Sequence, residues 1–219
     1  MMYAVFLLAV VPAVLGFSSG PPVGSSNPNL CTDMIPTGHN SGTSLASDTA
    51  NPPYTITASG DEYTRGGSLT VTITGTGGND FKGFFIQARR ADPTRNNDVA
   101  IGTFSSPPVT TQLQTCHDVE NSAWGHSSSV NRSSIAATWT APAQDEGPIK
   151  FKATIVKGVP NRDYFYLGVM SNQISFNATG GAPTQPPVTP TSGGPSHSVS
   201  VTLALVAALL ASFLSVHKY

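Results

Sequence analysis

The stretch Ser68-Leu69-Thr70-Val71-Thr72-Ile73-Thr74 decides the fold, because apolar and hydroxyl side chains alternate along it without a break. Successive side chains of a β-strand point to opposite faces, so this period of two predicts a strand with one buried face. The same alternation recurs at 134–140 and at 149–156. These three segments show the clearest strand pattern in the chain.

Further strands are predicted where aromatic and β-branched residues gather. They are Tyr54–Ala58, Phe81–Arg89, Ala100–Phe104, Tyr164–Met170 and Gln173–Phe176. Clusters of Gly, Pro and Asn separate the segments, and no stretch keeps the 3.6-residue period of an amphipathic helix for three turns. A sheet with one apolar face needs a second layer, so the predicted fold is an all-β sandwich of two sheets.

Length and charge limit the class of protein. The chain has 219 residues, of which 11% are charged, and a formal net charge of −1. One domain with extensions fits this length. Binding to nucleic acid requires a surplus of Lys and Arg, so the charge argues against a nucleic-acid partner.

Both ends of the chain carry apolar runs. Residues 1–16 form an uncharged apolar stretch that ends in a small residue, which predicts a secretory signal peptide. Residues 182–198 are rich in Pro, Thr, Ser and Gly and predict an extended stalk, and residues 199–219 contain the second apolar run. The folded domain is therefore expected within residues 17–181.

The C-terminal run has two interpretations. Small residues, with Ser192 and Gly193 as attachment candidates, precede a short spacer and an apolar tail, which is the layout of a glycolipid (GPI) anchor signal. The alternative is a single transmembrane helix, for which the run is barely long enough. Both interpretations predict a domain displayed outside the cell, and the anchor signal is favoured because the tail ends so soon after the apolar stretch.

Cys31 and Cys116 are the only cysteines. An even number in a secreted chain predicts that they pair, and such a bond would tie the strand-poor N-terminal segment onto the sandwich. Zinc is the weaker alternative, because no C-x-x-C spacing occurs. Two sequons, at Asn131 and Asn177, become candidate N-glycosylation sites in an exported chain, and Asn131 is favoured because it lies in a Ser-rich loop.

No motif of a known catalytic site occurs: the sequence contains no G-x-S-x-G, no H-E-x-x-H and no P-loop. We therefore expect no enzymatic activity and no cofactor. His39 and His126 follow the two cysteines at similar distances, so a disulfide could bring them together. A metal site with an added carboxylate is one hypothesis, and loop histidines that hydrogen-bond the backbone are the favoured one.

Arg89, Arg90 and Arg95 gather around one predicted loop. Guanidinium groups form bidentate hydrogen bonds with phosphate and carboxylate, so this cluster is a candidate site for anionic glycans or lipopolysaccharide. Asp92 and Asp98 interrupt it, and a solvated loop with internally neutralised charges is the favoured interpretation.

The order of several motifs resembles reeler (reelin N-terminal-like) domains over about residues 17–178. The most specific is the run F-K-G-F-x-x-Q-A-R at Phe81–Arg89, flanked by the two cysteines; the others are Cys31–His39, Pro53-Tyr54, Ile101–Phe104, Trp139–Pro142 and Gly147–Thr154. The resemblance implies an immunoglobulin-like sandwich with a disulfide between Cys31 and Cys116. In layout the chain is most similar to small invertebrate defence proteins of this family.

The resemblance also implies extracellular recognition. Defence members imply a microbial-surface glycan or lipopolysaccharide as partner, and spondin-like members imply adhesion through a matrix protein or glycosaminoglycan. A third branch joins the domain to a haem-binding module and a ferric-reducing cytochrome, but the single C-terminal apolar run offers no helices to enclose haem. The sequence thus predicts a cell-surface, non-enzymatic binding module of innate defence, with adhesion as the first alternative and a metal- or redox-linked protein as the second.

Overall fold

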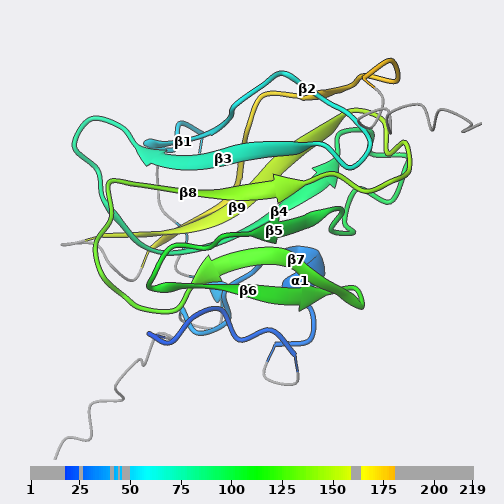
Figure 1. The fold of residues 1–219 in the computed structure, drawn as a ribbon. Coiled ribbons are helices and arrows are strands. Elements are labelled where there is room, and N and C mark those ends of the chain that lie inside the picture. Colours follow the sequence, from blue (N-terminus) through cyan, green and yellow to red (C-terminus); the bar gives the residue numbers. More distant parts are fainter. Residues whose placement is uncertain are drawn as a thin grey trace, which may run out of the picture. The chain divides into compact units, whose positions relative to one another are not determined.

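Two antiparallel sheets, packed face to face, form the fold (Figure 1). The structure is a computed structural model that describes residues 18–24, 27–39, 42–43, 45, 50–158 and 164–180. The first sheet has the order β1-β3-β8-β5 and the second the order β10-β9-β4-β7-β6, while β2 and β11 form a short parallel pair. The predicted all-β sandwich of two sheets is confirmed.

The elements have the following bounds: α1 (Leu30–Asp33), β1 (Tyr54–Ala58), β2 (Glu62–Tyr63), β3 (Ser68–Gly75), β4 (Phe81–Arg90), β5 (Thr103–Ser105), β6 (Thr111–Cys116), β7 (Val119–His126), β8 (Ser134–Thr140), β9 (Ile149–Lys157), β10 (Phe165–Met170) and β11 (Ser175–Phe176). All three strands with the clearest sequence pattern are present, as β3, β8 and β9.

The alternating pattern of β3 sets the register of the first sheet. Val71 of β3 is fully buried and lies opposite Ala58 of β1 and Ala137 of β8. The residues between the inward-facing ones are Thr and Ser, apart from Ala136, and they face outward. A one-residue slip would expose the apolar set, so the pattern fixes the pairing.

Aromatic rings fill the space between the sheets. Trp139 packs edge-on against Phe151 at 5.4 Å between ring centroids, and Trp124 packs against Phe84 at 4.7 Å. Both indoles are fully buried. The indole N–H of Trp139 donates to the carbonyl of Ile101 at 3.1 Å, whereas Nε1 of Trp124 has no hydrogen-bond partner among the described residues.

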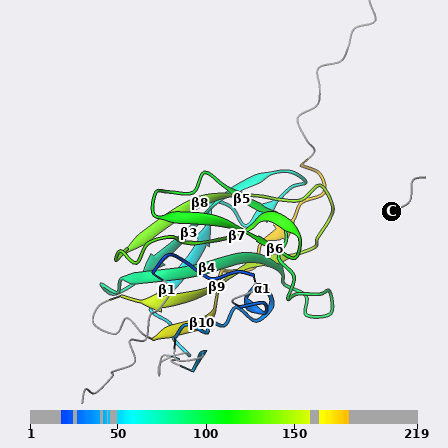
Figure 2. The ribbon, with the colours of Figure 1, turned by 90° about the horizontal axis from the view of Figure 1, so that it is seen from below.

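The central strand β4 is buried on both faces. Its inward side chains, such as Phe84 and Ile86, belong to the main core, while Phe85 packs outward against Leu30 and Met34 of the N-terminal segment. Figure 2 shows α1 and this segment lying against the second sheet. Because both faces are covered, β4 shows no alternation in the sequence, and its aromatic content was the signal that predicted it.

Three of the predicted strands begin later in the chain than expected. The segment predicted at Ala100–Phe104 becomes a strand only at Thr103, because Gly102 adopts a φ of +65° and Ile101 instead forms an isolated bridge with Ala88. The segments predicted at Tyr164–Met170 and Gln173–Phe176 begin later, at Phe165 and Ser175.

Strands β6 and β7 were not predicted at all. In β7 the residues from Ser122 to His126 are buried on both faces of the strand, and they include Ser, Ala and Gly. In β6, Thr and Gln predominate, and all but Thr115 are half-buried; Gln112 and Gln114 donate to carbonyls of the N-terminal segment. Neither strand therefore carries the period of two by which a half-buried strand is recognised.

The predicted signal peptide (1–16), stalk (182–198) and C-terminal tail (199–219), with Ser192 and Gly193, lie outside the described residues. Within the described ranges, no helix is long and apolar enough to cross a membrane.

Candidate functional site

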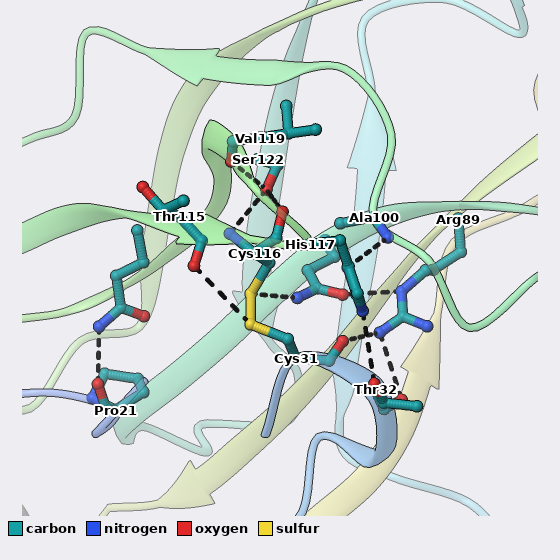
Figure 3. The surroundings of a disulfide bond; sticks show 12 residues. Pro21, Cys31, Thr32, Arg89, Ala100, Thr115, Cys116, His117, Val119 and Ser122 are labelled. Atoms are coloured by element: carbon teal, nitrogen blue, oxygen red, sulfur yellow. Dashed lines mark hydrogen bonds between the residues drawn. A yellow bond between two sulfur atoms is a disulfide. The ribbon is translucent and has the colours of Figure 1, made fainter. Parts of the chain in front are cut away.

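The disulfide between Cys31 and Cys116 joins α1 to the end of β6 (Figure 3). It links residues 85 positions apart and brings their Cα atoms to 5.4 Å. Gln87 of β4 donates from Nε2 to Sγ of Cys116 at 3.1 Å. The predicted pairing is confirmed, and the bond attaches the N-terminal segment to the outer face of the second sheet.

Arg89 of β4 also attaches the N-terminal segment to the second sheet, through hydrogen bonds. Its Nη2 donates to the carbonyl of Cys31 at 2.5 Å, and its Nε donates to Oε1 of Gln87 at 2.7 Å. Only 2% of the residue is exposed, and burial lowers the pKa of its guanidinium to about 10. Arg89 fits neither hypothesis for the arginine cluster: it is buried and not solvated, and its donors bind backbone and amide oxygens of the protein instead of an anion.

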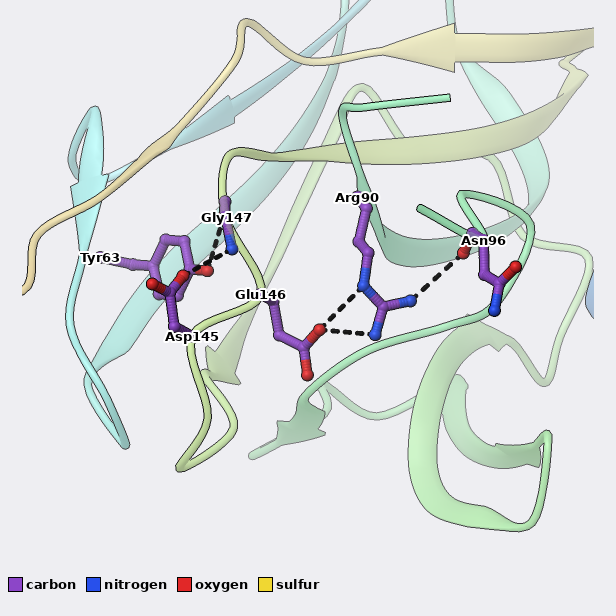
Figure 4. Close-up of polar contacts among 6 residues, drawn as sticks. All are labelled: Tyr63, Arg90, Asn96, Asp145, Glu146 and Gly147. Carbon is purple, nitrogen blue, oxygen red and sulfur yellow. Dashed lines mark hydrogen bonds and ion pairs between the residues drawn. The ribbon is translucent and has the colours of Figure 1, made fainter. Parts of the chain in front are cut away.

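Arg90 points to the opposite side of β4 and pairs with Glu146 (Figure 4). Nε and Nη2 donate to the same oxygen, Oε2, at 2.8 and 2.5 Å, and Nη1 donates to the carbonyl of Asn96 at 3.2 Å. Arg95 is exposed and lies against Gly147. The three arginines therefore form no cluster: successive side chains of β4 point to opposite faces, which separates Arg89 from Arg90. Arg90 is neutralised within the protein, as the favoured interpretation expects, but by Glu146 instead of Asp92 or Asp98.

A groove of about 400 Å³ adjoins this ion pair, and we call it the Glu146 groove. Arg90, Glu146 and Gln144 contribute polar side chains, Thr103 and Thr140 contribute hydroxyl groups, and Val119 contributes an apolar surface. Among the groove-lining residues that the structure describes, only Arg90 and Glu146 are charged, and they neutralise each other. The site thus presents paired charges and neutral polar groups.

Tyr63 fixes the segment that carries Glu146. Its hydroxyl donates to the carbonyl of Gly147 at 2.7 Å, and burial raises its pKa to about 12. Asp145 accepts a hydrogen bond from the N–H of Gly147 at 2.8 Å, which closes the turn. The carboxylate of Glu146 is therefore held in place by both its backbone and its partner Arg90 (Figure 4).

His39 and His126 line one apolar cavity of about 30 Å³, together with Leu30 and Met34. The backbone N–H of Phe84 donates to Nδ1 of His126 at 3.1 Å, and the ring of His39 packs edge-on against Phe165. The ring of His126 thus hydrogen-bonds the backbone, as the favoured interpretation expects, but His126 lies in strand β7 and not in a loop. Among the described residues, no carboxylate lines this cavity, and no group of three His, Cys, Asp or Glu could hold a metal ion.

The two sequons have different surroundings. Asn131 is exposed in the loop before β8. Asn177 is half-buried: its Nδ2 donates to Oε2 of Glu62 at 2.8 Å, and its Oδ1 accepts from the hydroxyl of Thr179 at 2.7 Å. The sequence motif alone could not distinguish these environments.

A sequence profile of the reeler domain matches residues 29–181. The chain belongs to the reeler domain family. Putative defense protein 1 of Antheraea mylitta is 35% identical over 167 residues, which cover 74% of this chain and 90% of that protein. Putative ferric-chelate reductase 1 of Danio rerio is 35% identical over 153 residues, which cover 69% of this chain and 25% of the reductase.

The solved reeler domain of human F-spondin is 24% identical, with a TM-score of 0.47, and the match covers 57% of this chain and 88% of that fragment. This reeler chain thus spans about a quarter of the reductase but nearly the whole of the defence protein.

Proposed function

We propose that this chain is an extracellular, non-enzymatic reeler protein of innate defence that binds microbial surfaces while anchored to the host-cell membrane. The observation that supports this proposal is the extent of the match to the defence proteins. The alignment reaches 90% of the length of one such relative and 92% of another, so the similarity extends over most of each of these proteins.

The contacts within the domain support a binding role. The N-terminal segment is held by the disulfide, by the buried Arg89 and by the hydroxyl of Thr154, which donates to the carbonyl of Met34 at 2.6 Å. Surfaces that are fixed before binding lose less entropy when a partner docks. A disulfide of this kind forms in oxidising compartments, which supports export through the secretory pathway.

Binding is tested by displaying the full chain on cultured cells and measuring the adhesion of fluorescent bacteria and yeast. Cells that express no reeler protein are the control. We expect microbes to adhere to the displaying cells. Adhesion to immobilised heparin or matrix proteins, with no capture of microbes, would overturn the defence role in favour of cell adhesion.

Anchoring is tested on the same cells with phosphatidylinositol-specific phospholipase C. We expect the enzyme to release the domain, because the C-terminal signal is proposed to be replaced by a glycolipid. Retention of the domain, with Tyr219 still detected by mass spectrometry, would establish a transmembrane helix instead.

A further inference from the structure

The outer face of the first sheet carries hydroxyl groups and no charge. Every outward side chain of β1, β3, β8 and β5 is Thr, Ser or Ala. Edge strands of a sheet, such as β1 and β5 here, commonly carry charged residues, especially Lys, that oppose unwanted pairing. We call this surface the hydroxyl face.

The register arranges these hydroxyl groups in rows across the strands. In one row, Ser68 of β3 lies opposite Thr140 of β8, and Thr140 lies opposite Thr103 of β5. The hydroxyl groups of Ser68 and Thr140 are 3.0 Å apart and hydrogen-bonded. Neighbouring strands are spaced at about 4.8 Å, so the row carries hydroxyl groups across three adjacent strands of the sheet.

This row ends at the Glu146 groove, since Thr103 and Thr140 belong to both. At the groove, the two hydrogen bonds that Glu146 accepts from Arg90 both end on Oε2, which leaves Oε1 as an acceptor for a ligand hydroxyl. The amide of Gln144 adds a donor and an acceptor. Val119, 40% exposed, and Pro142 provide apolar surface for the C–H groups of a sugar ring.

We propose that the Glu146 groove and the row Ser68–Thr140–Thr103 bind a neutral polysaccharide of the microbial surface. The charges favour a neutral ligand: Arg90 is already paired, and the hydroxyl face offers no cation to a phosphate or sulfate group. A ligand rich in hydroxyl groups satisfies the donors and acceptors of this surface without separating the ion pair. This inference rests on the proposed microbial-surface binding and assigns a ligand class and a location to it.

The test measures retention of the purified full chain on chitin beads, yeast mannan and β-glucan particles, with lipopolysaccharide and heparin as anionic comparisons. We expect retention on at least one neutral polymer, with little loss at high salt, because no charge pairing is involved. Thr140→Lys places a long charged side chain in the row and should weaken that retention about tenfold or more. Thr103→Lys should act in the same direction.

The matched control is Thr55→Lys, the same substitution on β1, the strand at the opposite edge of the same sheet. It should bind like the unmodified chain, and melting curves of all three variants establish that each is folded. If Thr140→Lys does not fold, Thr103→Lys alone decides the location.

The outcomes separate this inference from the proposed function. If neutral polymers retain the Lys variants of Thr103 and Thr140 as well as the unmodified chain, the location is wrong. If whole microbes are captured but only lipopolysaccharide retains the chain, the ligand class is wrong and the proposed function stands. If neither microbes nor any polymer is bound, both are overturned.

Discussion

Replacing each tryptophan by phenylalanine should have unequal effects on stability, although both indoles are fully buried. Trp139→Phe removes the donor to the carbonyl of Ile101, which is left buried without that partner at a cost of about 1–3 kcal/mol. Trp124→Phe instead removes an N–H that has no partner, which recovers a desolvation penalty of about 1–3 kcal/mol.

Both substitutions also leave a cavity of similar size, so this cost largely cancels when the two variants are compared. The two lower limits add to a difference of about 2 kcal/mol, with Trp139→Phe the less stable variant. The assay is equilibrium urea unfolding with the disulfide intact, followed by far-ultraviolet circular dichroism. Equal losses of unfolding free energy, or a larger loss for Trp124→Phe, would refute this account of the core.

The comparison also bears on the proposed binding site. The carbonyl that Trp139 holds belongs to Ile101, which lines the Glu146 groove with its neighbours Gly102 and Thr103. Loss of that hydrogen bond should loosen this wall of the groove as well as the core. Trp124 lines no part of the groove, so Trp124→Phe controls for a general effect on the fold.

Three further predictions concern single positions. Gly102→Ala should lower the unfolding free energy more than the control Gly66→Ala in the urea assay. Both positions have a φ near +65°, which costs alanine about 1–2 kcal/mol. Only at Gly102 would the new Cβ also collide with neighbouring atoms, namely Nε1 of Trp139 and the carbonyl of Thr140. Equal losses of unfolding free energy in the two alanine variants would contradict this expectation, because the collision at Gly102 would then be relieved without cost. Burial, and then the charge of Arg89, lower the pKa of His117 below its usual 6.5. Below that pH the unfolded chain therefore binds more protons than the folded chain, and the stability of the fold decreases on acidification. His117→Gln should make the melting temperature depend less on pH in this range, and an unchanged pH profile would contradict this prediction. Asn131→Gln should remove the mass of one N-glycan from the secreted chain, because Asn131 is exposed before β8; an unchanged mass would show that this sequon is not used.

Much of the sandwich could be predicted because apolar and polar residues alternate along a strand that has one buried face. Leu69, Val71 and Ile73 are buried, and the Thr residues between them face outward. The pattern fails where the N-terminal segment covers the outer face, as at β7, because both sides of the strand then exclude water. That cover is a long-range contact, and no local period reports it.

The candidate site was less predictable than the fold. Spacing alone placed Arg89 and Arg90 together, but one is buried under α1 and the other pairs with Glu146 across 56 positions of sequence. Successive side chains of a strand point to opposite faces, so extending the predicted strand Phe81–Arg89 by one residue would have separated the two side chains. The partner of Arg90 could not be identified from the sequence, because it depends on how the segment before β9 is held by Tyr63.

The most direct measurement of the central claim is hydrogen exchange of the full chain, alone and mixed with soluble yeast mannan and chitin oligosaccharides. The account predicts that a neutral saccharide slows amide exchange in the segments 99–105 and 140–146, which border the groove, and leaves α1 and β10 unchanged. Slower exchange confined to the second sheet, or binding that leaves both groove segments unchanged, would contradict it.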